Sequence, residues 1–388
     1  MFKKSPEILA RKIKLAFLIN TLGGGGAEKV VLDICRQVNK QIFDVYVLYW
    51  TDGSFLEDFK KIPEINLLKL RTSVTKGDNF LKELIAFFKI QLELRQLYRK
   101  YRWNILHSQL GREDANASIL KRQFPHLKII STKQNIDPIR QKFLGRLIFG
   151  FFNRNFDRIV SGSNLIKIFT AQYEFYPLRK IQTIYNGVDL SIVQKAQRRS
   201  YKFINPDEFT IITAGRLNTQ KGFPHLILAF KEFTEMVQNS RLLICGEGEE
   251  KKSLKSLIAK EQIGDKVVFI GWRADLHDLF KSCDVFAMLS NWEGLSMSFL
   301  EAMAAGLPVI GSNQDFMKEE VFDGKNGFLV DRLNPNDCAA KFYQLYEDPE
   351  LRSQMGQAGI NLVKTRFSVQ NMTTKYEQLY MKLQGTNE

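Results

Sequence analysis

The sequence has few cysteines, no long apolar run and no clustered histidines, and each shortage argues against a class of protein. Its four cysteines form no C-x-x-C pair, so a structural zinc site, a redox dithiol and a disulfide-stapled secreted fold are disfavoured and we expect a reducing compartment. No apolar run reaches about 18 residues, so the sequence predicts no membrane-spanning helix. The basic and apolar start, residues 3–19, lacks a small-residue cleavage site, and we interpret it as a first buried strand rather than a signal peptide.

The commonest nucleotide-binding spacings are absent as well. Residues 23–26 are all glycine and stand between an apolar run and a helical pattern, but Glu28 and Lys29 occupy the positions where G-x-G-x-x-G requires its last glycine. No G-x-x-x-x-G-K-[ST] occurs, so NAD, FAD and P-loop sites are disfavoured. The glycines still allow backbone N–H groups to approach a phosphate at a helix N-terminus; the alternative is a flexible turn.

The net charge of +14 is unevenly distributed. Residues 1–200 carry 35 Lys and Arg against 17 Asp and Glu, a balance of +18, whereas residues 201–388 carry 21 against 25, a balance of −4. The first half therefore favours an anionic partner, either a membrane surface or a nucleic acid.

Short apolar runs alternate with longer helical patterns along the chain, which predicts βαβ units and parallel sheets. The expected strands of the first half are 13–20, 43–50, 65–70, 104–107, 128–132, 157–161 and 181–185; those of the second half are 209–214, 241–245, 266–270, 284–289, 307–311 and 327–330. Two such series predict two doubly wound α/β domains, joined in the polar, turn-rich stretch 186–207. Ligands bind beyond the carboxyl ends of strands in such sheets, so we expect a ligand in a cleft between two facing domains.

Two loops that follow expected strands of the second half carry charges suited to a sugar diphosphate. Arg216 and Lys221 follow the strand 209–214, where fixed cations can stabilise a departing diphosphate. Glu293 and Glu301 stand eight residues apart, in a loop and in the following helix, where carboxylates can accept hydrogen bonds from sugar hydroxyls and the helix start near 295–297 can bind a phosphate. The alternatives are an ordinary basic surface loop and a solvated helix with two charges.

His107 ends an expected strand, and the residues alone leave open whether it binds a ligand or is a satisfied core histidine. The four histidines form no metal-spaced cluster and no D-x-D triplet occurs, so metal-dependent sugar transfer of the D-x-D type lacks support.

Taken together, these motifs resemble family 4 of the retaining glycosyltransferases, which have the GT-B fold. The matching segments are the glycine loop with Ala27-Glu28, His107, Ser163-Asn164, 185–189, Gly215-Arg216 with Lys221-Gly222, 245–248, 269–272, and Glu293 to Glu301 followed by 306–309. Their order and spacing over nearly the whole chain carry the resemblance. It implies two Rossmann-like domains facing across a donor-binding cleft: residues 1–190 on the acceptor side, with a C-terminal helix at about 368–388 packing back on them, and residues 191–367 binding the nucleotide sugar.

The resemblance also implies site residues. Those it assigns to catalysis are Arg216, Lys221, Glu293 and His107. Those it assigns to donor binding are Gly25, Gly26, Gly248, Trp272, Arg273, Gly294, Leu295, Ser296 and Glu301. On the acceptor and sugar side it places Gln109 and Gln134, where the family usually has a second histidine.

Within these sets, the resemblance implies that Arg216 and Lys221 bind the diphosphate, Glu301 the ribose and Glu293 the donor sugar, while Trp272 and Arg273 lie beside the base and His107 or Gln109 reaches the transferred sugar. A second departure from the family is the stretch 314–319, which replaces a Gly-Gly turn before a Glu. The donor sugar is therefore less well defined than the reaction class.

The expected activity is retaining transfer of a sugar from a nucleotide-diphosphate sugar, with front-face attack and no protein nucleophile. The expected donor is a UDP-sugar, and the Gly-Gly-Ala-Glu start suits an N-acetylated sugar and a glycan or polyprenyl-diphosphate-linked acceptor. No metal or other cofactor is expected, because fixed cations and a helix end replace it. We expect a cytoplasmic protein, peripheral on the inner face of a membrane.

Two other functions are alternatives to retaining sugar transfer. An epimerase-like enzyme of the same fold would lack the Glu293–Glu301 pattern, and a phosphorylase would need a pyridoxal lysine and a longer chain. A non-catalytic module that binds a membrane or nucleic acid would explain the basic first half. No RNA-binding motif occurs and the aromatic residues are not interleaved with basic ones, so we expect no nucleic-acid partner. The sequence does not determine the oligomeric state.

Two segments of the first half combine apolar and basic residues at helical spacing. In 140–154, Leu144, Leu147, Ile148 and Phe151 share one helix face, which we expect mostly to pack on the sheet, with Phe143 and Phe149 directed outward among basic residues. The segment 80–101 is similar. The basic flanks and outward phenylalanines predict an anionic membrane surface as partner.

Overall fold

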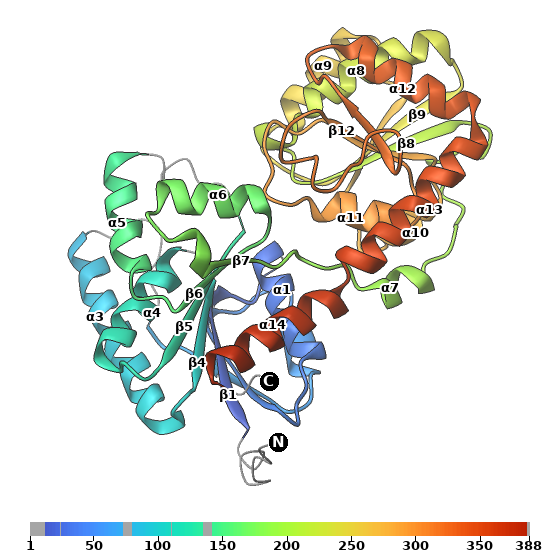
Figure 1. The fold of residues 1–388 in the computed structure, drawn as a ribbon. Coiled ribbons are helices and arrows are strands. Elements are labelled where there is room, and N and C mark those ends of the chain that lie inside the picture. The colour runs from blue at the N-terminus through green and yellow to red at the C-terminus, as the bar shows by residue number, and fades with distance from the viewer. Residues whose placement is uncertain (1–11, 24, 73–79, 110, 135–141, 386–388) are drawn as a thin grey trace. The chain divides into compact units, whose positions relative to one another are not determined.

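The computed structural model describes residues 12–23, 25–72, 80–109, 111–134 and 142–385, and the chain divides into two compact units (Figure 1). One unit comprises Met1–Tyr185 and Gln370–Glu388, and the other comprises Asn186–Val369. Each unit has its own parallel sheet, so the predicted fold class of two doubly wound α/β domains is confirmed.

The sheet of the first unit has seven strands in the order β3-β2-β1-β4-β5-β6-β7. Their bounds are β1 (Ile13–Thr21), β2 (Phe43–Thr51), β3 (Ile65–Lys69), β4 (Ile105–Gln109), β5 (Lys128–Lys133), β6 (Arg158–Ser161) and β7 (Ile181–Thr183). All pairs are parallel, and each strand overlaps a predicted one. The central strand β1 is buried on both faces, which is why it reads as a continuous apolar run.

The helices of the first unit cover both faces of this sheet. They are α1 (Gly26–Gln37), α2 (Leu56–Lys60), α3 (Phe80–Tyr101), α4 (Gly111–Gln123), α5 (Phe143–Asn153), α6 (Asn164–Tyr173), η3 (Leu178–Lys180) and α14 (Val369–Leu383). Since βαβ crossovers are right-handed, the reversal of strand order after β3 puts α3 to α6 on one face and α1 and α2 on the other. Figure 1 shows α3, α4 and α5 on one side of the sheet, and α1 and α14 on the opposite side.

The second unit repeats the architecture with six parallel strands in the order β10-β9-β8-β11-β12-β13. The strands are β8 (Phe209–Ala214), β9 (Ser240–Cys245), β10 (Val267–Gly271), β11 (Val285–Met288), β12 (Val309–Ser312) and β13 (Gly327–Val330). The helices are α7 (Leu190–Lys195), η4 (Thr219–Lys221), α8 (Phe223–Met236), α9 (Lys251–Lys260), α10 (Leu276–Lys281), α11 (Met297–Ala304), α12 (Pro335–Glu347) and α13 (Pro349–Arg366). One core cluster joins α8, α9 and α12 to one face of the sheet; it contains Phe230 and Phe233 of α8, Leu254 of α9 and Phe342 of α12.

The last helix, α14, is fastened to the first sheet by buried polar contacts. The Tyr380 hydroxyl lies 2.8 Å from His107 Nδ1, and the other ring nitrogen of His107, Nε2, lies 2.6 Å from Thr132 Oγ1. The Tyr376 hydroxyl is 3.2 Å from the same Thr132 oxygen. His107 is fully buried, and burial lowers its pKa to about 3, so the ring is neutral at physiological pH.

These contacts overturn the role that the resemblance gave to His107. Both of its ring nitrogens are engaged inside the core and none of its surface is exposed, so His107 does not reach a transferred sugar. It is a satisfied core histidine that holds α14.

The packing of α5 also differs from the expectation. Leu147, Ile148 and Phe151 are exposed instead of packing on the sheet, and the side chain of Leu144 lies outside the described residues. The inward side of α5 carries small residues: a Cβ on Gly150 would stand 3.1 Å from the Phe175 ring, so glycine lets the backbones approach. Phe143 is exposed as predicted, but Phe149 is half-buried against Gly111.

Tyr380→Phe should destabilise the first unit, because it leaves a buried ring nitrogen of His107 without its partner. An unsatisfied buried polar group costs about 1–3 kcal/mol. Denaturant unfolding would measure the loss, with Tyr343→Phe on the exposed side of α12 as the matched control that should leave stability unchanged. Equal stability of Tyr380→Phe and wild type would contradict the fastening role.

Candidate functional site

The loops at the carboxyl edge of the second sheet lie close together because glycines permit it. Gly222 has φ +62°, and a Cβ there would stand 2.0 Å from the Leu289 carbonyl oxygen. Gly246 has φ +138°, and a Cβ there would stand 1.9 Å from the carbonyl oxygen of Gly215. The loop after β8 is therefore in backbone contact with the loops after β9 and β11, and no larger residue would fit at either position.

At this edge, three side chains converge on the carboxylate of Glu293. Its buried carboxylate lies 2.6 Å from Lys221 Nζ and accepts hydrogen bonds from Ser290 Oγ at 2.9 Å and Gln220 Nε2 at 3.1 Å. A buried carboxylate requires such partners, since an unpaired charge in the interior is costly. The structure thus brings together two predicted site residues, Lys221 and Glu293, and adds Gln220 and Ser290, which sequence reasoning missed.

Arg216 belongs to the same loop but is differently placed. Its side chain is 73% exposed, and its nearest carboxylate is the exposed Glu249 at 3.5 Å. An exposed pair at this distance contributes little and is easily exchanged. Arg216 is therefore a cation that can turn toward an anionic ligand at little cost.

Glu320 is a further residue that sequence reasoning missed. It is fully buried, and its Oε1 accepts the backbone N–H of Ser296 at 2.8 Å, while its Oε2 has no partner among the described residues. Burial raises the pKa of Glu320 well above its usual value, which favours the neutral acid. No spacing or periodicity in the sequence distinguishes Glu320 from the neighbouring Glu319.

This contact corrects the expected phosphate site at the start of α11. The Ser296 amide is already bonded inside the protein, so it does not point at a ligand. Gly294 is buried and Leu295 half-buried beside it. The anion site predicted at 295–297 therefore loses one of its donors.

The remaining donor-side residues occupy neighbouring loops and helices. Glu301 lies on α11, with its Oε1 4.0 Å from His277 Nε2. Trp272, after β10, is 77% exposed and presents a free aromatic face. Arg273 is paired with Asp275 at 2.6 Å, which raises the pKa of its guanidinium, so Arg273 supports the loop rather than standing ready for a ligand. Gly248 lies against the Leu217 carbonyl oxygen, where a Cβ would be 2.2 Å away.

The carboxyl edge of the first sheet gathers polar groups of its own. Gly25 caps α1 and Gly26 begins it, and a Cβ on Gly26 would stand 3.8 Å from Gln134 Oε1. Gln109 ends β4, with its Nε2 3.3 Å from His107 Nε2. Gln109 Oε1 and Gln134 Nε2 have no hydrogen-bond partner among the described residues. Gln109 is fully buried, as His107 is, whereas Gln134 is partly exposed and can bind a ligand.

Two glutamates share this edge. Glu28, in the first turn of α1, and Glu113, in the first turn of α4, are both buried. Burial raises the pKa of Glu113 to about 7, and the charges of Asp114 and Glu28 add to the effect. Burial also raises the pKa of Glu28. Among the described residues, no group of three or more His, Cys, Asp or Glu side chains could hold a metal ion.

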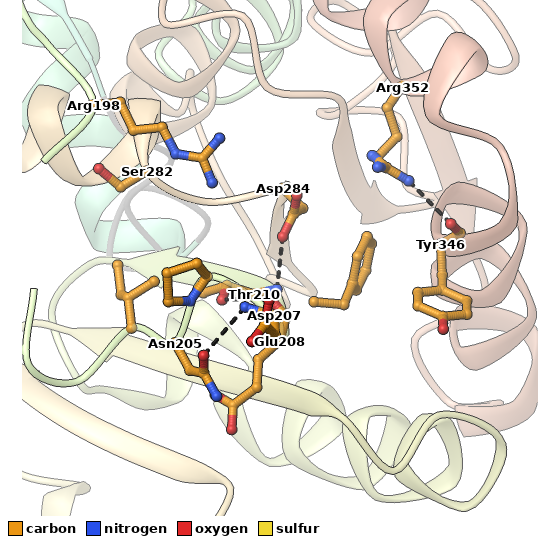
Figure 2. A pocket seen from close by; sticks show the side chains of 12 residues that line it. Arg198, Asn205, Asp207, Glu208, Thr210, Ser282, Asp284, Tyr346 and Arg352 are labelled. Atoms are coloured by element: carbon orange, nitrogen blue, oxygen red, sulfur yellow. Dashed lines mark hydrogen bonds between the residues drawn. The ribbon is translucent and has the colours of Figure 1, made fainter. Parts of the chain in front are cut away.

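A pocket of about 180 Å³ lies at the opposite edge of the second sheet (Figure 2). It is lined by Arg198, Thr210, Asp284 and Arg352 among others. Asp284, just before β11, accepts the backbone N–H of Thr210 at the start of β8 at 2.8 Å, so the pocket is at the amino ends of the strands. Open parallel sheets bind ligands at the carboxyl ends, and we assign no substrate to this pocket.

Comparison with known proteins agrees with this geometry. A family model described as Glycosyltransferase Family 4 matches residues 24–192, and one described as Glycosyl transferases group 1 matches residues 194–362. The two matches abut and together take in most of both units.

Three known proteins illustrate the similarity. The chain is 31% identical over 191 residues to the putative glycosyltransferase EpsD of Bacillus subtilis, covering 49% of this chain and only 50% of EpsD. It is 26% identical over 366 residues to the N-acetylgalactosamine-N,N'-diacetylbacillosaminyl-diphospho-undecaprenol 4-alpha-N-acetylgalactosaminyltransferase of Campylobacter jejuni, covering 91% of this chain and 94% of that one. The crystal structure of Anabaena Alr3699/HepE in complex with UDP-glucose superposes with a TM-score of 0.79 at 20% identity, covering 95% of this chain and 100% of HepE, which shows the shared fold.

Glu113→Gln should stabilise the protein in a pH-dependent way. The carboxyl has a pKa of about 7 when folded and an ordinary pKa of 4.5, so its burial costs nothing below about pH 4.5, costs more as the pH rises from 4.5 to 7, and reaches a constant cost above 7. We expect a gain of about 1–3 kcal/mol at pH 8 and less at pH 5, measured by denaturant unfolding. Glu57→Gln, an exposed substitution in the same unit, should change stability by under about 0.5 kcal/mol at both pH values. A destabilised Glu113→Gln at pH 8 would show that the carboxylate is charged and stabilising.

Proposed function

The chain belongs to the family 4 glycosyltransferases with the GT-B fold, and on this premise we propose that it transfers a sugar from a UDP-sugar to a glycan or polyprenyl-diphosphate-linked acceptor with retention of anomeric configuration. The observation that carries the proposal is the carboxyl edge of the second sheet. There the buried Lys221–Glu293 pair and the exposed Arg216 project from loops that glycines hold together.

The reaction needs a stabilised leaving group. The acceptor hydroxyl forms a new bond to the anomeric carbon on the face from which the diphosphate departs, and the old bond between that carbon and the β-phosphate oxygen breaks with its electrons on UDP. The acceptor proton passes to that departing oxygen. Lys221, which Glu293 holds in place, and Arg216, which can turn toward the ligand, neutralise part of the charge that accumulates on the diphosphate.

The donor would be held by the loops around this pair. Glu301 on α11 suits the ribose hydroxyls, and the exposed Trp272 offers a face for the base. Glu293, whose two oxygens are occupied by Lys221, Ser290 and Gln220, acts mainly by fixing the loop 290–296 beside the donor sugar. In the first unit, Gly25 and Gly26 leave backbone N–H groups at the start of α1 that can bind a phosphate.

The choice of substrates rests on the relatives. The HepE structure contains UDP-glucose, and the Campylobacter relative is named for an N-acetylated sugar and an undecaprenyl-diphosphate acceptor. On the acceptor side, Gln134, which is partly exposed and whose Nε2 has no hydrogen-bond partner among the described residues, can bind a sugar hydroxyl. We propose that no metal is required, since the two cations supply the charge, and that the protein works in the cytoplasm at the inner face of a membrane.

Arg216→Ala is the cleaner test of the leaving-group role. Lys221→Ala would also strand the buried Glu293 carboxylate, whereas Arg216 is exposed and its loss should leave the fold intact. Turnover of UDP-sugars, followed by mass spectrometry with EDTA present, should fall about 10²–10³-fold. Lys260→Ala, an exposed change at the far end of α9, is the matched control.

Near-wild-type turnover of Arg216→Ala would remove the leaving-group assignment. Epimerisation of the donor without transfer would favour the epimerase-like alternative. Activity that disappears in EDTA and returns with Mg²⁺ would contradict the metal-free reaction.

A further inference from the structure

The exposed side of α5 is apolar. Phe143, Leu147, Ile148 and Phe151 recur at helical spacing, and their exposed fractions lie between 46% and 76%. The opposite side of the helix already packs through Gly145, Gly150 and Asn153, which are buried. Apart from Phe151, whose ring contacts Phe152 and the guanidinium of Arg122, about half or more of each side chain in this stripe is left in solvent, although the stripe is as apolar as a core-facing one.

The exposed side of α3 repeats the pattern. Ile85, Phe88 and Leu92 are 48%, 60% and 57% exposed and lie on one side of the helix. On its other side, Ile90 and Leu94 are buried in the core under the sheet. So α3 has two apolar sides, and folding of the unit covers only one of them.

Helix α4 joins these two stripes into one surface. Gln91 of α3 donates to Asn116 of α4 at 2.6 Å, and the Arg122 guanidinium of α4 lies 4.3 Å from the Phe151 ring centroid on α5. Figure 1 shows α3, α4 and α5 in one layer on the same side of the first sheet. We call the solvent side of this layer, with the two stripes, the outer face.

The described side chains of the outer face include exposed basic residues and no exposed acid. Over residues 84–154, the acids whose side chains the structure describes are Glu93, Glu113 and Asp114, and none of them is exposed. Glu93 caps the backbone N–H groups of Arg71 and Thr72, and Asp114 pairs with the buried Lys133. The exposed basic residues of the same stretch are Lys89, Arg95, Arg99, Lys100, Arg102, Arg112, Arg122, Lys142 and Arg154.

From this combination we propose that the outer face docks the protein on an anionic lipid bilayer. The phenylalanine, leucine and isoleucine side chains enter the boundary between headgroups and acyl chains, while the surrounding Lys and Arg bind lipid phosphates. No helix among the described residues is long and apolar enough to cross a bilayer. The docking is interfacial, and it does not depend on the proposed reaction.

The charge and the apolar residues of the outer face favour an anionic bilayer over a second copy of the chain or a nucleic acid. A second copy of the chain would bring one basic face against another, with no exposed acid on this stretch to compensate. A nucleic acid would match the charge of the outer face. It would, however, place the aliphatic side chains of Leu92, Leu147 and Ile148 against a charged phosphate backbone, where they make no favourable apolar contact. An anionic bilayer matches both the charge and the apolar stripes.

The position of the outer face suits a lipid-linked acceptor. Helix α5 follows β5 and α3 follows β3, so both helices begin near the carboxyl edge of the sheet. Gln109 and Gln134 lie at this same edge. A diphosphate-linked sugar anchored in the bilayer would therefore stand close to the proposed acceptor side of the site.

The test is flotation with vesicles of phosphatidylglycerol and phosphatidylcholine, compared with phosphatidylcholine alone. Wild type should bind the anionic vesicles at low salt and release as salt rises. The triple variant Phe143→Ser/Leu147→Ser/Phe151→Ser should lower the partition coefficient about tenfold or more. Arg95→Gln/Arg112→Gln/Arg154→Gln should lower it by up to about fivefold for each charge removed.

The matched control is Met236→Ser/Leu333→Ser, which removes exposed apolar side chains from the second unit and should bind vesicles like wild type. Thermal unfolding and UDP binding of every variant would verify the fold. Equal binding by wild type and the triple apolar variant, or no wild-type binding at low salt, would overturn the proposal. So would sedimentation showing a lipid-free dimer that the triple variant dissociates. Loss of vesicle binding with turnover of a water-soluble acceptor unchanged would support the docking separately from the reaction.

Discussion

The burial of the Glu293 carboxylate is the constraint on which the candidate donor site depends. The charge is tolerated because Lys221 and Gln220 from the loop after β8, and Ser290 from its own loop, converge on it. This convergence requires the two loops to touch, which is why Gly222 must lie against the Leu289 carbonyl without a side chain. Lys221 is thereby fixed in place by Glu293, whereas the exposed Arg216 can turn toward an anionic ligand.

The strands, and the position of the loops that carry the candidate site residues, could be predicted from the sequence because their signals are local. A parallel strand that is covered on both faces has an unbroken apolar sequence, as Ile13–Thr21 does. Candidate ligand-binding residues follow such strands directly, because the carboxyl ends of the strands are where open parallel sheets bind ligands. The sequence marks Lys221 and Glu293 as candidate site residues, but only the structure shows that they form a pair.

The failures of prediction share one physical reason: burial is decided by segments distant in the chain. His107 is a core residue because Tyr380, 273 positions later, returns to bond it. The large side chains of α5 were expected to face the sheet, but glycines allow closer packing on the other side and leave Leu147 and Phe151 in solvent. Glu320 is buried where the Ser296 amide, 24 positions earlier in the chain, donates a hydrogen bond to its carboxylate. None of these contacts leaves a periodic or spacing signal.

The central claim is tested most directly by the stereochemistry of the product. Proton NMR would follow a UDP-α-sugar mixed with a short-chain polyprenyl-diphosphate sugar, in EDTA and with vesicles present. The account predicts release of UDP together with an α-linked product. A β-linked product, or a chain that transfers no sugar from any UDP donor, would contradict it.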